Sequence, residues 1–174
     1  SLKDHWYAES FTPDWDYLSR ISLKLAKVGD PEAVNGLICK DDSGPGEVVG
    51  RFVYEPTFLT TGAAWRPAMV SKELVRGEKY WIVLPKLGDA SDTVRWYHDD
   101  GAAGEHAWSD DGATWTVVSS SFVLAFRTYY EITVIAQAAD STSKDMFHGW
   151  REVVVRDESI VDYDVAKMIA QAKL

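Results

Sequence analysis

Residues 77–84 read GEKYWIVL, and the last five of them are all apolar. Side chains along a strand alternate between its two faces, so Tyr80, Ile82 and Leu84 share one face. Trp81 and Val83 share the opposite face. A strand that is apolar on both faces is typically buried on both. The sequence therefore predicts a central strand at residues 80–84.

Short runs with the same two-residue period lie on both sides of this strand. Alternation is clear in residues 21–26 and 122–127, where large apolar side chains occupy every second position. Clusters of Gly, Pro, Asp or Ser separate most of the other candidates. Many short strands at this spacing are typical of an all-β fold, an antiparallel β-sandwich. The further strands are predicted at residues 34–40, 47–54, 65–71, 93–98, 105–109, 114–119 and 131–137.

The C-terminal part of the chain has a different pattern. All six Pro lie before residue 86, and eleven of the twelve Gly lie before residue 113. Further on, Val165, Met168 and Ile169 have the spacing of one helix face. We therefore predict a linker or leading strand at residues 1–7, the sandwich at 8–128, and an extension of strand, loop and helix at 129–174.

The charge balance bounds the possible partners. Lys and Arg number 18 against 27 Asp and Glu, a formal net charge of −9. Such a chain offers no electrostatic footprint for nucleic acid or an anionic membrane surface. Its apolar runs are also far shorter than the ~20 residues of a membrane span. We expect a soluble protein without membrane insertion, and the initial Ser1 indicates a piece of a longer chain.

The single cysteine, Cys39, rules out an internal disulfide framework and a multi-cysteine metal site. Its apolar neighbours Leu37 and Ile38 predict a small buried side chain.

Residues 108–115 read WSDDGATW between two predicted strands. They are similar to the Asp-box of sialidases, with Trp108 where that motif has Ser or Thr. We expect Asp110 to accept backbone N–H bonds in the turn, Gly112 to adopt a positive φ, and Trp115 to fold back over the hairpin. In that family the Asp-box is a structural hairpin, so we interpret this one as structural.

Eight Trp and eight Tyr exceed what an ordinary core of this size needs. Sugar-binding surfaces place aromatic faces against pyranose C–H groups, with a few polar groups beside them. Residues 96–98 lead into a loop of small residues, which favours exposed rings. Plain packing is the alternative, because alternation places Trp96 and Tyr97 on opposite faces of a strand. The candidate carbohydrate-binding residues are Trp96, Tyr97, Trp108, His98 and His106.

Acidic pairs in the predicted loops offer oxygen ligands for Ca²⁺. The candidate calcium ligands are Asp99 and Asp100, although their spacing matches no known calcium loop. His98 and His106 are expected to face each other across a hairpin, where they would hold a metal with Asp99. Solvated turn residues are the alternative interpretation, and no other cofactor is indicated.

The sequence carries no motif of a known catalytic site. A phosphate-binding Gly-rich loop, HExxH, GxSxG and a recognisable Cys-based triad are all missing. Nothing places two carboxylates across a cleft at the spacing of a glycosidase. We therefore expect a protein that is not an enzyme.

A series of short motifs follows one order along residues 8–128. They are AESFTP (8–13), ISLKLAKVG (21–29), SGPG (43–46), LVRGEKYWIVL (74–84), WSDDGATW (108–115) and LAFRTY (124–129). In this order they resemble the choice-of-anchor R domain, a jelly-roll-like β-sandwich family of bacterial surface and phage tail proteins. The resemblance implies a non-catalytic module similar to carbohydrate-binding sandwiches, and it supplies no ligand residues.

The C-terminal part resembles a second family. Residues 140–143 (DSTS) and 147–152 (FHGWRE) precede the predicted helix. They are similar to a segment of tail-hub and tail-tip proteins of tailed phages, which reads Ser, three residues, Tyr-Gly-x-Arg-Glu. Phe147 stands here for that Tyr, and His148 is an extra residue.

This second resemblance implies that the sandwich is inserted in a tail protein. Residues 1–7 would then pair with the outgoing strand 129–137. A strand and helix that simply close the sandwich are the alternative.

These observations predict an accessory domain of a virion tail that binds cell-surface glycan for host adhesion. Its partners would be cell-surface glycans and other tail subunits, with a homo-oligomer as a further expectation and an extracellular location on the virion tail. One alternative is a purely structural tail domain that packs against neighbouring subunits. Another is a carbohydrate-binding module of a secreted polysaccharide-degrading enzyme.

Overall fold

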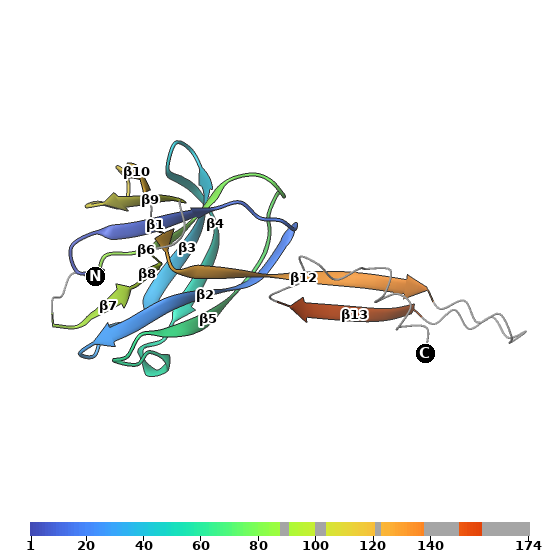
Figure 1. Ribbon diagram of the computed structural model, residues 1–174, viewed down its shortest axis with the longest axis horizontal. Helices are drawn as coiled ribbons and strands as arrows, with labels where there is room; N and C mark the ends of the chain where they lie inside the picture. The colour runs from blue at the N-terminus through green and yellow to red at the C-terminus, as the bar shows by residue number, and fades with distance from the viewer. Residues whose placement is uncertain (88–90, 100–103, 121–122, 138–149, 158–174) are drawn as a thin grey trace, which may run out of the picture. The chain divides into compact units, whose positions relative to one another are not determined.

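The computed structural model describes residues 1–87, 91–99, 104–120, 123–137 and 150–157. The chain divides into two compact units, Ser1–Thr128 and Tyr129–Leu174, which we call the first and second units. The described secondary structure consists of strands and one short 3₁₀ turn (Figure 1). The chain therefore belongs to the all-β class over its described residues.

The larger sheet of the first unit has six strands, all paired antiparallel to their neighbours. One of its two central strands, β6, is buried at all five positions and pairs with β1 on one side and β3 on the other. The prediction of a central strand at residues 80–84 is confirmed. In sheet order the strands are β10 (Thr116–Ser120), β9 (Gly104–Ser109), β1 (Trp6–Phe11), β6 (Tyr80–Leu84), β3 (Val34–Asp41) and β4 (Pro45–Tyr54).

The other sheet is built on the long strand β2 (Tyr17–Val28). Strands β5 (Ala64–Glu73) and β7 (Thr93–Trp96) both pair with β2, and β12 (Phe126–Gln137) follows β2 in the sheet order. A bulge between Leu18 and Arg20 shifts the alternation by one residue. Leu18 and Ile21 are therefore both fully buried although they lie three positions apart.

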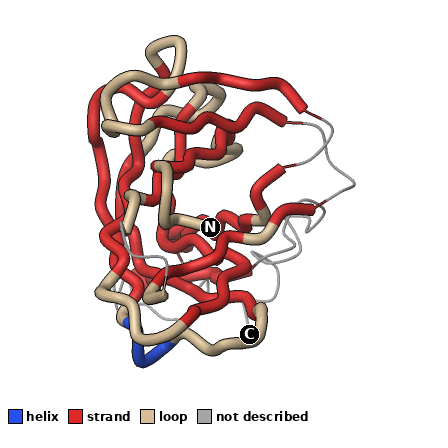
Figure 2. Tube along the Cα trace, turned by 90° about the vertical axis from the view of Figure 1, so that its left-hand side faces the viewer, coloured by secondary structure: helices blue, strands red, loops and turns tan. Residues whose placement is uncertain are grey.

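Two short elements complete the first unit. Strands β8 (His98–Asp99) and β11 (Val123–Leu124) form a small ribbon, and η1 (Pro56–Phe58) is the 3₁₀ turn after β4. Figure 2 shows η1 as the helical segment among strands and loops. The predicted strand 93–98 is interrupted at Tyr97, whose backbone N–H donates to the Lys24 carbonyl at 3.0 Å.

The core lies between the two sheets, as expected of a β-sandwich. The Phe11 ring on β1 lies 6.2 Å from the Phe126 ring on β12 and 6.0 Å from the Tyr80 ring. Apolar side chains of β2 and β6, including Leu23 and Ile82, are fully buried. Burial of this continuous apolar surface is the main contribution to the stability of the fold.

A second apolar cluster covers the opposite face of the six-stranded sheet. Cys39 is buried there beside the fully buried Trp81, which confirms the prediction of a small buried side chain. The partly buried rings of Trp6 and Trp115 pack against this cluster. Part of the aromatic surplus therefore serves packing.

The N-terminal residues differ from their prediction. Trp6 and Tyr7 belong to β1, whose two edges pair with β6 and β9. Tyr7 has partners on both edges and Trp6 pairs with Ser109 on β9, so the prediction that these two residues pair with residues 129–137 is wrong. The fully buried Leu2 is held by hydrogen bonds of 2.9 and 2.8 Å that join its backbone to Val94 and Leu87.

The second unit contains a long antiparallel hairpin in its described part. The end of β12 pairs with β13 (Trp150–Asp157), from Tyr130 opposite Asp157 to Gln137 opposite Trp150. The predicted strand at residues 131–137 is thus confirmed, whereas β13 was not predicted. The predicted C-terminal helix lies outside the described residues.

Candidate functional site

One face of the β1–β9 strand pair gathers aromatic side chains. Tyr7 on β1 is the register partner of Trp108 on β9, and Glu9 is the partner of His106. Alternation along both strands places these four side chains on the same face, where directly opposite residues contact each other. His5, just before β1, adds a fourth ring beside those of Tyr7, His106 and Trp108. We call His5, Tyr7, His106 and Trp108 the aromatic site.

The His5 ring meets the Trp108 and Tyr7 rings edge to face. The His5 ring lies 5.0 Å from the Trp108 ring at an interplanar angle of 60°, and 6.0 Å from the Tyr7 ring at 87°. All four members are partly exposed, so the site combines packed rings with accessible surface. Burial raises the pKa of the Tyr7 hydroxyl, and the nearby Asp4 carboxylate adds to the shift. Burial lowers the pKa of His106, which favours its neutral form.

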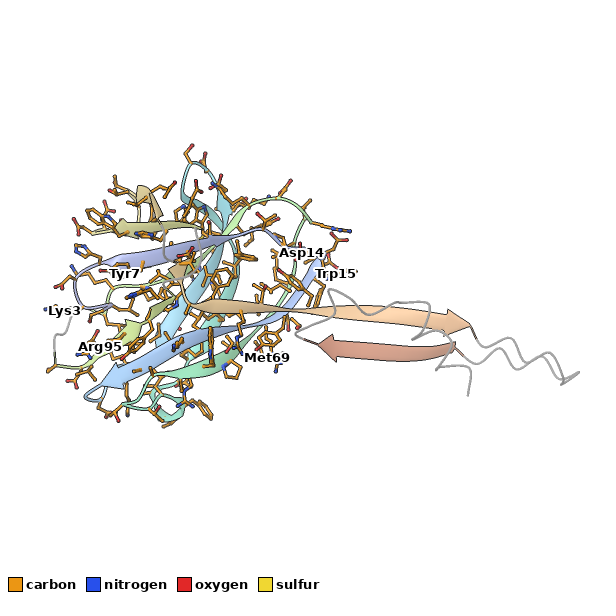
Figure 3. The ribbon with its side chains drawn as sticks, in the orientation of Figure 1. Lys3, Tyr7, Asp14, Trp15, Met69 and Arg95 are labelled. Carbon is orange, nitrogen blue, oxygen red and sulfur yellow. The ribbon has the colours of Figure 1, made fainter. Side chains whose placement is uncertain are left out.

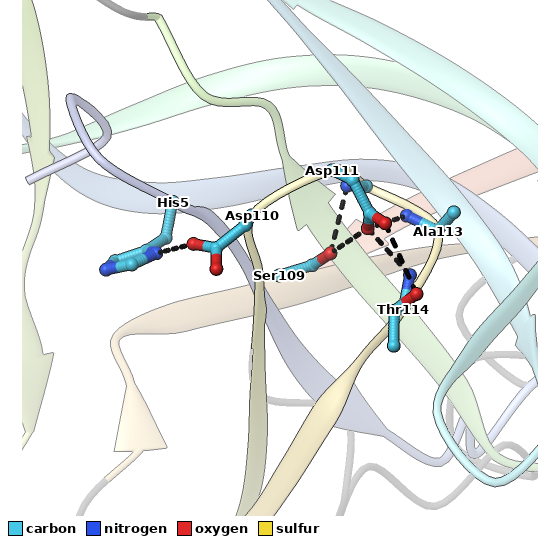
Figure 4. Close-up of polar contacts among 7 residues, drawn as sticks. His5, Ser109, Asp110, Asp111, Ala113 and Thr114 are labelled. Atoms are coloured by element: carbon cyan, nitrogen blue, oxygen red, sulfur yellow. Dashed lines mark hydrogen bonds and ion pairs between the residues drawn. The ribbon is translucent and has the colours of Figure 1, made fainter.

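The loop between β9 and β10 fixes the orientation of His5. The Asp110 Oδ1 atom lies 2.6 Å from His5 Nδ1 (Figure 4). This contact ties the chain just before β1 to the end of β9. His5 was not among the predicted site residues, because nothing in the sequence joins it to a residue 105 positions away.

Asp111 closes the same loop. Its Oδ1 atom accepts hydrogen bonds from the backbone N–H groups of Ala113 and Thr114, both at 2.8 Å. A contact of 2.9 Å joins Oδ1 to the Ser109 hydroxyl, and the Gly112 N–H donates to that hydroxyl oxygen. The hydrogen bonds from Thr114 and Ala113, with Ser109, hold the Asp111 pKa well below its usual range.

The predicted positive φ of Gly112 is confirmed, whereas the prediction that Asp110 accepts the backbone hydrogen bonds is wrong. The acceptor of the backbone N–H groups is Asp111, because Asp110 points to His5 instead. Gly112 has the expected positive φ of 74°. Trp115 packs against the apolar cluster around Trp81.

Glu9 is a buried carboxyl group on the same sheet face as the aromatic site. The side chain is fully buried, and its Oε2 atom accepts a 2.8 Å hydrogen bond from the Leu124 N–H. The Oε1 atom is buried without a hydrogen-bond partner. Burial raises the pKa of the carboxyl to about 8, against the opposing effect of the Leu124 hydrogen bond. The group is therefore mostly protonated at neutral pH.

Trp96 is a core residue, which corrects its place in the predicted platform. It is only 7% exposed, and its indole Nε1 donates to the Ala125 carbonyl at 3.0 Å. Its register partner is the fully buried Leu25 on β2. The ring is enclosed by the sandwich, so its face is not accessible to a sugar.

The other predicted site residues fall into two groups. Trp108 and His106 belong to the aromatic site on β9. Tyr97 is partly exposed in the link between β7 and β8, and His98 is exposed on β8. His98 pairs with Leu124 on β11, whereas β9 has β1 and β10 as its neighbours. The prediction that His98 and His106 face each other across a hairpin is therefore wrong.

The calcium prediction falls largely outside the described part of the chain. The backbone of Asp99 pairs with Val123, while its side chain and all of Asp100 are not among the described residues. Within the residues that are described, no group of three or more His, Cys, Asp or Glu side chains is arranged to hold a metal ion.

The charged groups of a separate polar cluster pair with one another. The Lys79 ammonium lies 2.8 Å from Glu105 Oε2 and 3.1 Å from Asp41 Oδ1. The Trp81 indole N–H also donates to Asp41 Oδ1, at 2.7 Å. The hydrogen bond to Glu105 is the main reason that the pKa of Lys79 is raised. These contacts indicate a structural role for Asp41.

Comparison of the chain with protein-family models, curated proteins and solved structures found no match. Over the ranges that the structure covers, none of the helical segments has the length and apolar character to cross a membrane. What the observations define is a β-sandwich with an aromatic site on one sheet face.

Proposed function

We propose that this chain is a non-catalytic accessory domain of a virion tail that binds cell-surface carbohydrate through the aromatic site. The observation that carries the proposal is the gathering of Tyr7, Trp108 and His5 as partly exposed, contacting rings on one sheet face. The resemblances to the jelly-roll-like choice-of-anchor R domain and to tail-hub and tail-tip proteins support the location on a tail.

The chemistry of the site suits a sugar ligand. Aromatic faces stack on the apolar C–H face of a pyranose, while adjacent polar groups bind its hydroxyls. His106 supplies such a polar group on the same strand as Trp108. Tyr7, His106 and Trp108 project from paired strands and the His5 ring is held by Asp110, so little conformational freedom is lost on binding.

The buried and the loop carboxylates support a non-catalytic role. Glu9 is fully enclosed and mostly protonated, and Asp111 uses its oxygens to hold the loop. A glycosidase needs two carboxyl groups that flank an accessible scissile bond. Neither of these two groups is placed for that work.

Weak binding per site is sufficient for this role. Many copies on one particle convert a low affinity per site into strong attachment, because later contacts form at high effective concentration. The domain would bind the host surface reversibly while other tail parts attach the particle irreversibly.

The test is titration of the chain with fragments of host envelope polysaccharide, followed by tryptophan fluorescence and calorimetry. We expect saturable binding that is lost in Trp108→Ala and weakened in Tyr7→Ala and His106→Ala. Trp15→Ala is the matched control, because Trp15 is 36% exposed and lies far from Tyr7 in Figure 3. Circular dichroism establishes that each variant is folded. Absence of binding at millimolar glycan, or equal losses in Trp108→Ala and Trp15→Ala, would contradict the proposal.

A purely structural tail domain is the second candidate. The observation in its favour is a separate exposed apolar surface around Phe58 and Met69, which are 69% and 63% exposed. This role predicts that deletion of residues 8–128 from the parent tail protein blocks particle assembly. Intact particles that fail to attach to cells would instead favour the adhesion role.

A further inference from the structure

A groove lies where the end of β4, the η1 turn and β5 meet. It has a volume of about 510 Å³, and its lining includes Val53, Glu55, Phe58, Arg66 and Met69. Strands β4 and β5 are the end strands of their sheets in the sheet order. Figure 3 shows Met69 on the β5 side of the first unit, away from Tyr7. The groove is therefore separate from the aromatic site, and we call it the β4–β5 groove.

The rim of this groove exposes large apolar side chains. Phe58 is 69% exposed, Met69 63% and Val53 45%. Contiguous exposed apolar side chains of this kind mark interaction surfaces, and Phe and Met are enriched at the cores of protein interfaces. Phe58 is the last residue of the 3₁₀ turn η1, so its ring projects from a defined backbone. The surface thus has both a projecting ring and a hollow beside it.

The same groove carries two opposite charges that do not pair with each other. The Arg66 guanidinium makes one side-chain hydrogen bond among the described residues, from Nη2 to the Thr60 hydroxyl at 2.6 Å. Its Nε atom is buried without a partner. The ion pairs of the described chain involve neither Arg66 nor Glu55. Both residues line the groove, and neither charge is neutralised by an ion pair among the described residues.

We propose that the β4–β5 groove is the interface of a two-fold symmetric homodimer. Phe58 of each copy enters the groove of the other copy, and Arg66 of each copy pairs with Glu55 of the other. A two-fold interface uses the same surface on both subunits and must be self-complementary. This surface meets that requirement, because it carries the exposed Phe58 ring beside a groove that can receive such a ring. It also carries both the Arg66 cation and the Glu55 carboxylate.

The charges favour a second copy over other occupants of the groove. An acidic ligand attracted by Arg66 would also face Glu55, and a cationic ligand attracted by Glu55 would face Arg66. A second copy related by a two-fold axis pairs both charges at once. The inference does not rest on carbohydrate binding, although a dimer would carry two aromatic sites and so gain avidity.

Sedimentation velocity of the full chain at about 0.15 M salt tests the dimer, since salt at that level screens the repulsion between two acidic copies. We expect a concentration-dependent monomer–dimer equilibrium that Phe58→Asp and Met69→Asp each weaken at least tenfold. Val75→Asp is the matched control, because Val75 is 54% exposed and is not part of the groove lining. A chain that stays monomeric at millimolar concentration would overturn the proposal. So would a dimer that Phe58→Asp weakens no more than Val75→Asp.

Charge reversal tests the pairing of Arg66 with Glu55. Glu55→Arg and Arg66→Glu are each expected to weaken the dimer, and a mixture of the two variants is expected to form a heterodimer with both ion pairs restored. If Arg66→Glu does not fold by circular dichroism, Glu55→Arg is compared with Glu55→Gln, and the reversal must weaken the dimer more. The assigned pairing would be contradicted if the two folded variants, when mixed, do not form a heterodimer. It would also be contradicted if Glu55→Arg and Glu55→Gln form equally strong dimers.

Discussion

The Nδ1 atom of His5 lies 2.6 Å from the Oδ1 atom of Asp110. This contact joins the residue just before β1 to the loop that follows β9. It also positions the His5 ring against Trp108, 5.0 Å away. The aromatic site therefore depends on a polar contact outside its own strand pair.

Asp110→Ala is expected to affect ligand binding more than stability. The pair is solvent-exposed, and such contacts contribute about 0–1 kcal/mol to folding. Loss of the contact frees the His5 ring, so binding at the aromatic site is expected to weaken severalfold. Urea unfolding and glycan titration of the same variant separate the two effects. Asp14→Ala is a control for the loss of one exposed acidic residue, and a similar loss of glycan affinity in both variants would argue against a positioning role.

Glu9 is expected to make the stability of the fold depend on pH. The carboxyl pKa is about 8 in the native state and near 4.5 when the chain is unfolded. Between these values the native state retains a proton that the unfolded state has lost, so stability falls as pH rises. The slope for one such group approaches 1.4 kcal/mol per pH unit. Urea unfolding at pH 5, 6.5, 8 and 9 measures how the free energy of unfolding changes with pH. The decrease in this free energy is expected to be nearly complete by pH 9.

The Glu9→Gln variant isolates this effect from other titrating groups. Glutamine has the shape of the protonated carboxyl but does not ionise, so the slope between pH 5 and pH 8 is expected to flatten. Burial lowers the pKa of His106, the register partner of Glu9, and this residue is present in both proteins. An identical pH slope in the variant and the unchanged protein would show that Glu9 is not the responsible group.

The sequence was sufficient for the strands whose pattern is uninterrupted. The β6 run is apolar on both faces and was predicted as central. Of β1 only the start was anticipated, as a linker or leading strand at residues 1–7, because the polar Glu9 interrupts its buried face. The break at Tyr97 depends on hydrogen bonds with distant residues: its N–H donates to the Lys24 carbonyl, and its carbonyl accepts from the Ala125 N–H. Such long-range contacts leave no local trace in the sequence.

The candidate site was predicted only in part for the same reason. Alternation indicated that Trp96 or Tyr97 is core, but the face that meets the other sheet depends on tertiary packing, which buries Trp96. Asp110 and Asp111 are adjacent and chemically identical, so only the loop geometry separates their roles. His106 and Trp108, two residues apart on one predicted strand, could be placed on a common face from sequence.

Trp96→Ala and Trp108→Ala are expected to differ in kind. Trp96 is buried and hydrogen-bonded, so its truncation is expected to cost about 3–5 kcal/mol of folding free energy. Trp108 is partly exposed, so its truncation is expected to cost clearly less. Chemical denaturation of the two variants measures the difference. Equal destabilisation would show that Trp108 is as much a core residue as Trp96.

Gly112→Ala is expected to destabilise the β9–β10 loop more than a backbone effect alone explains. Gly112 has a positive φ of 74°, and a Cβ there would lie 2.8 Å from the Trp6 ring. Gly77→Ala is the matched control, since Gly77 has a similar φ of 81° with nothing within 4 Å of the added carbon. The control is expected to show only the backbone cost, about 1 kcal/mol, because an L-residue adopts this region with strain. Gly112→Ala adds a steric clash that must displace the Trp6 ring from the apolar cluster around Trp81. Thermal unfolding of both variants is followed by tryptophan fluorescence. We expect Gly112→Ala to lower the unfolding temperature more than Gly77→Ala does. An equal decrease in both variants would mean that the Trp6 ring moves aside at no cost.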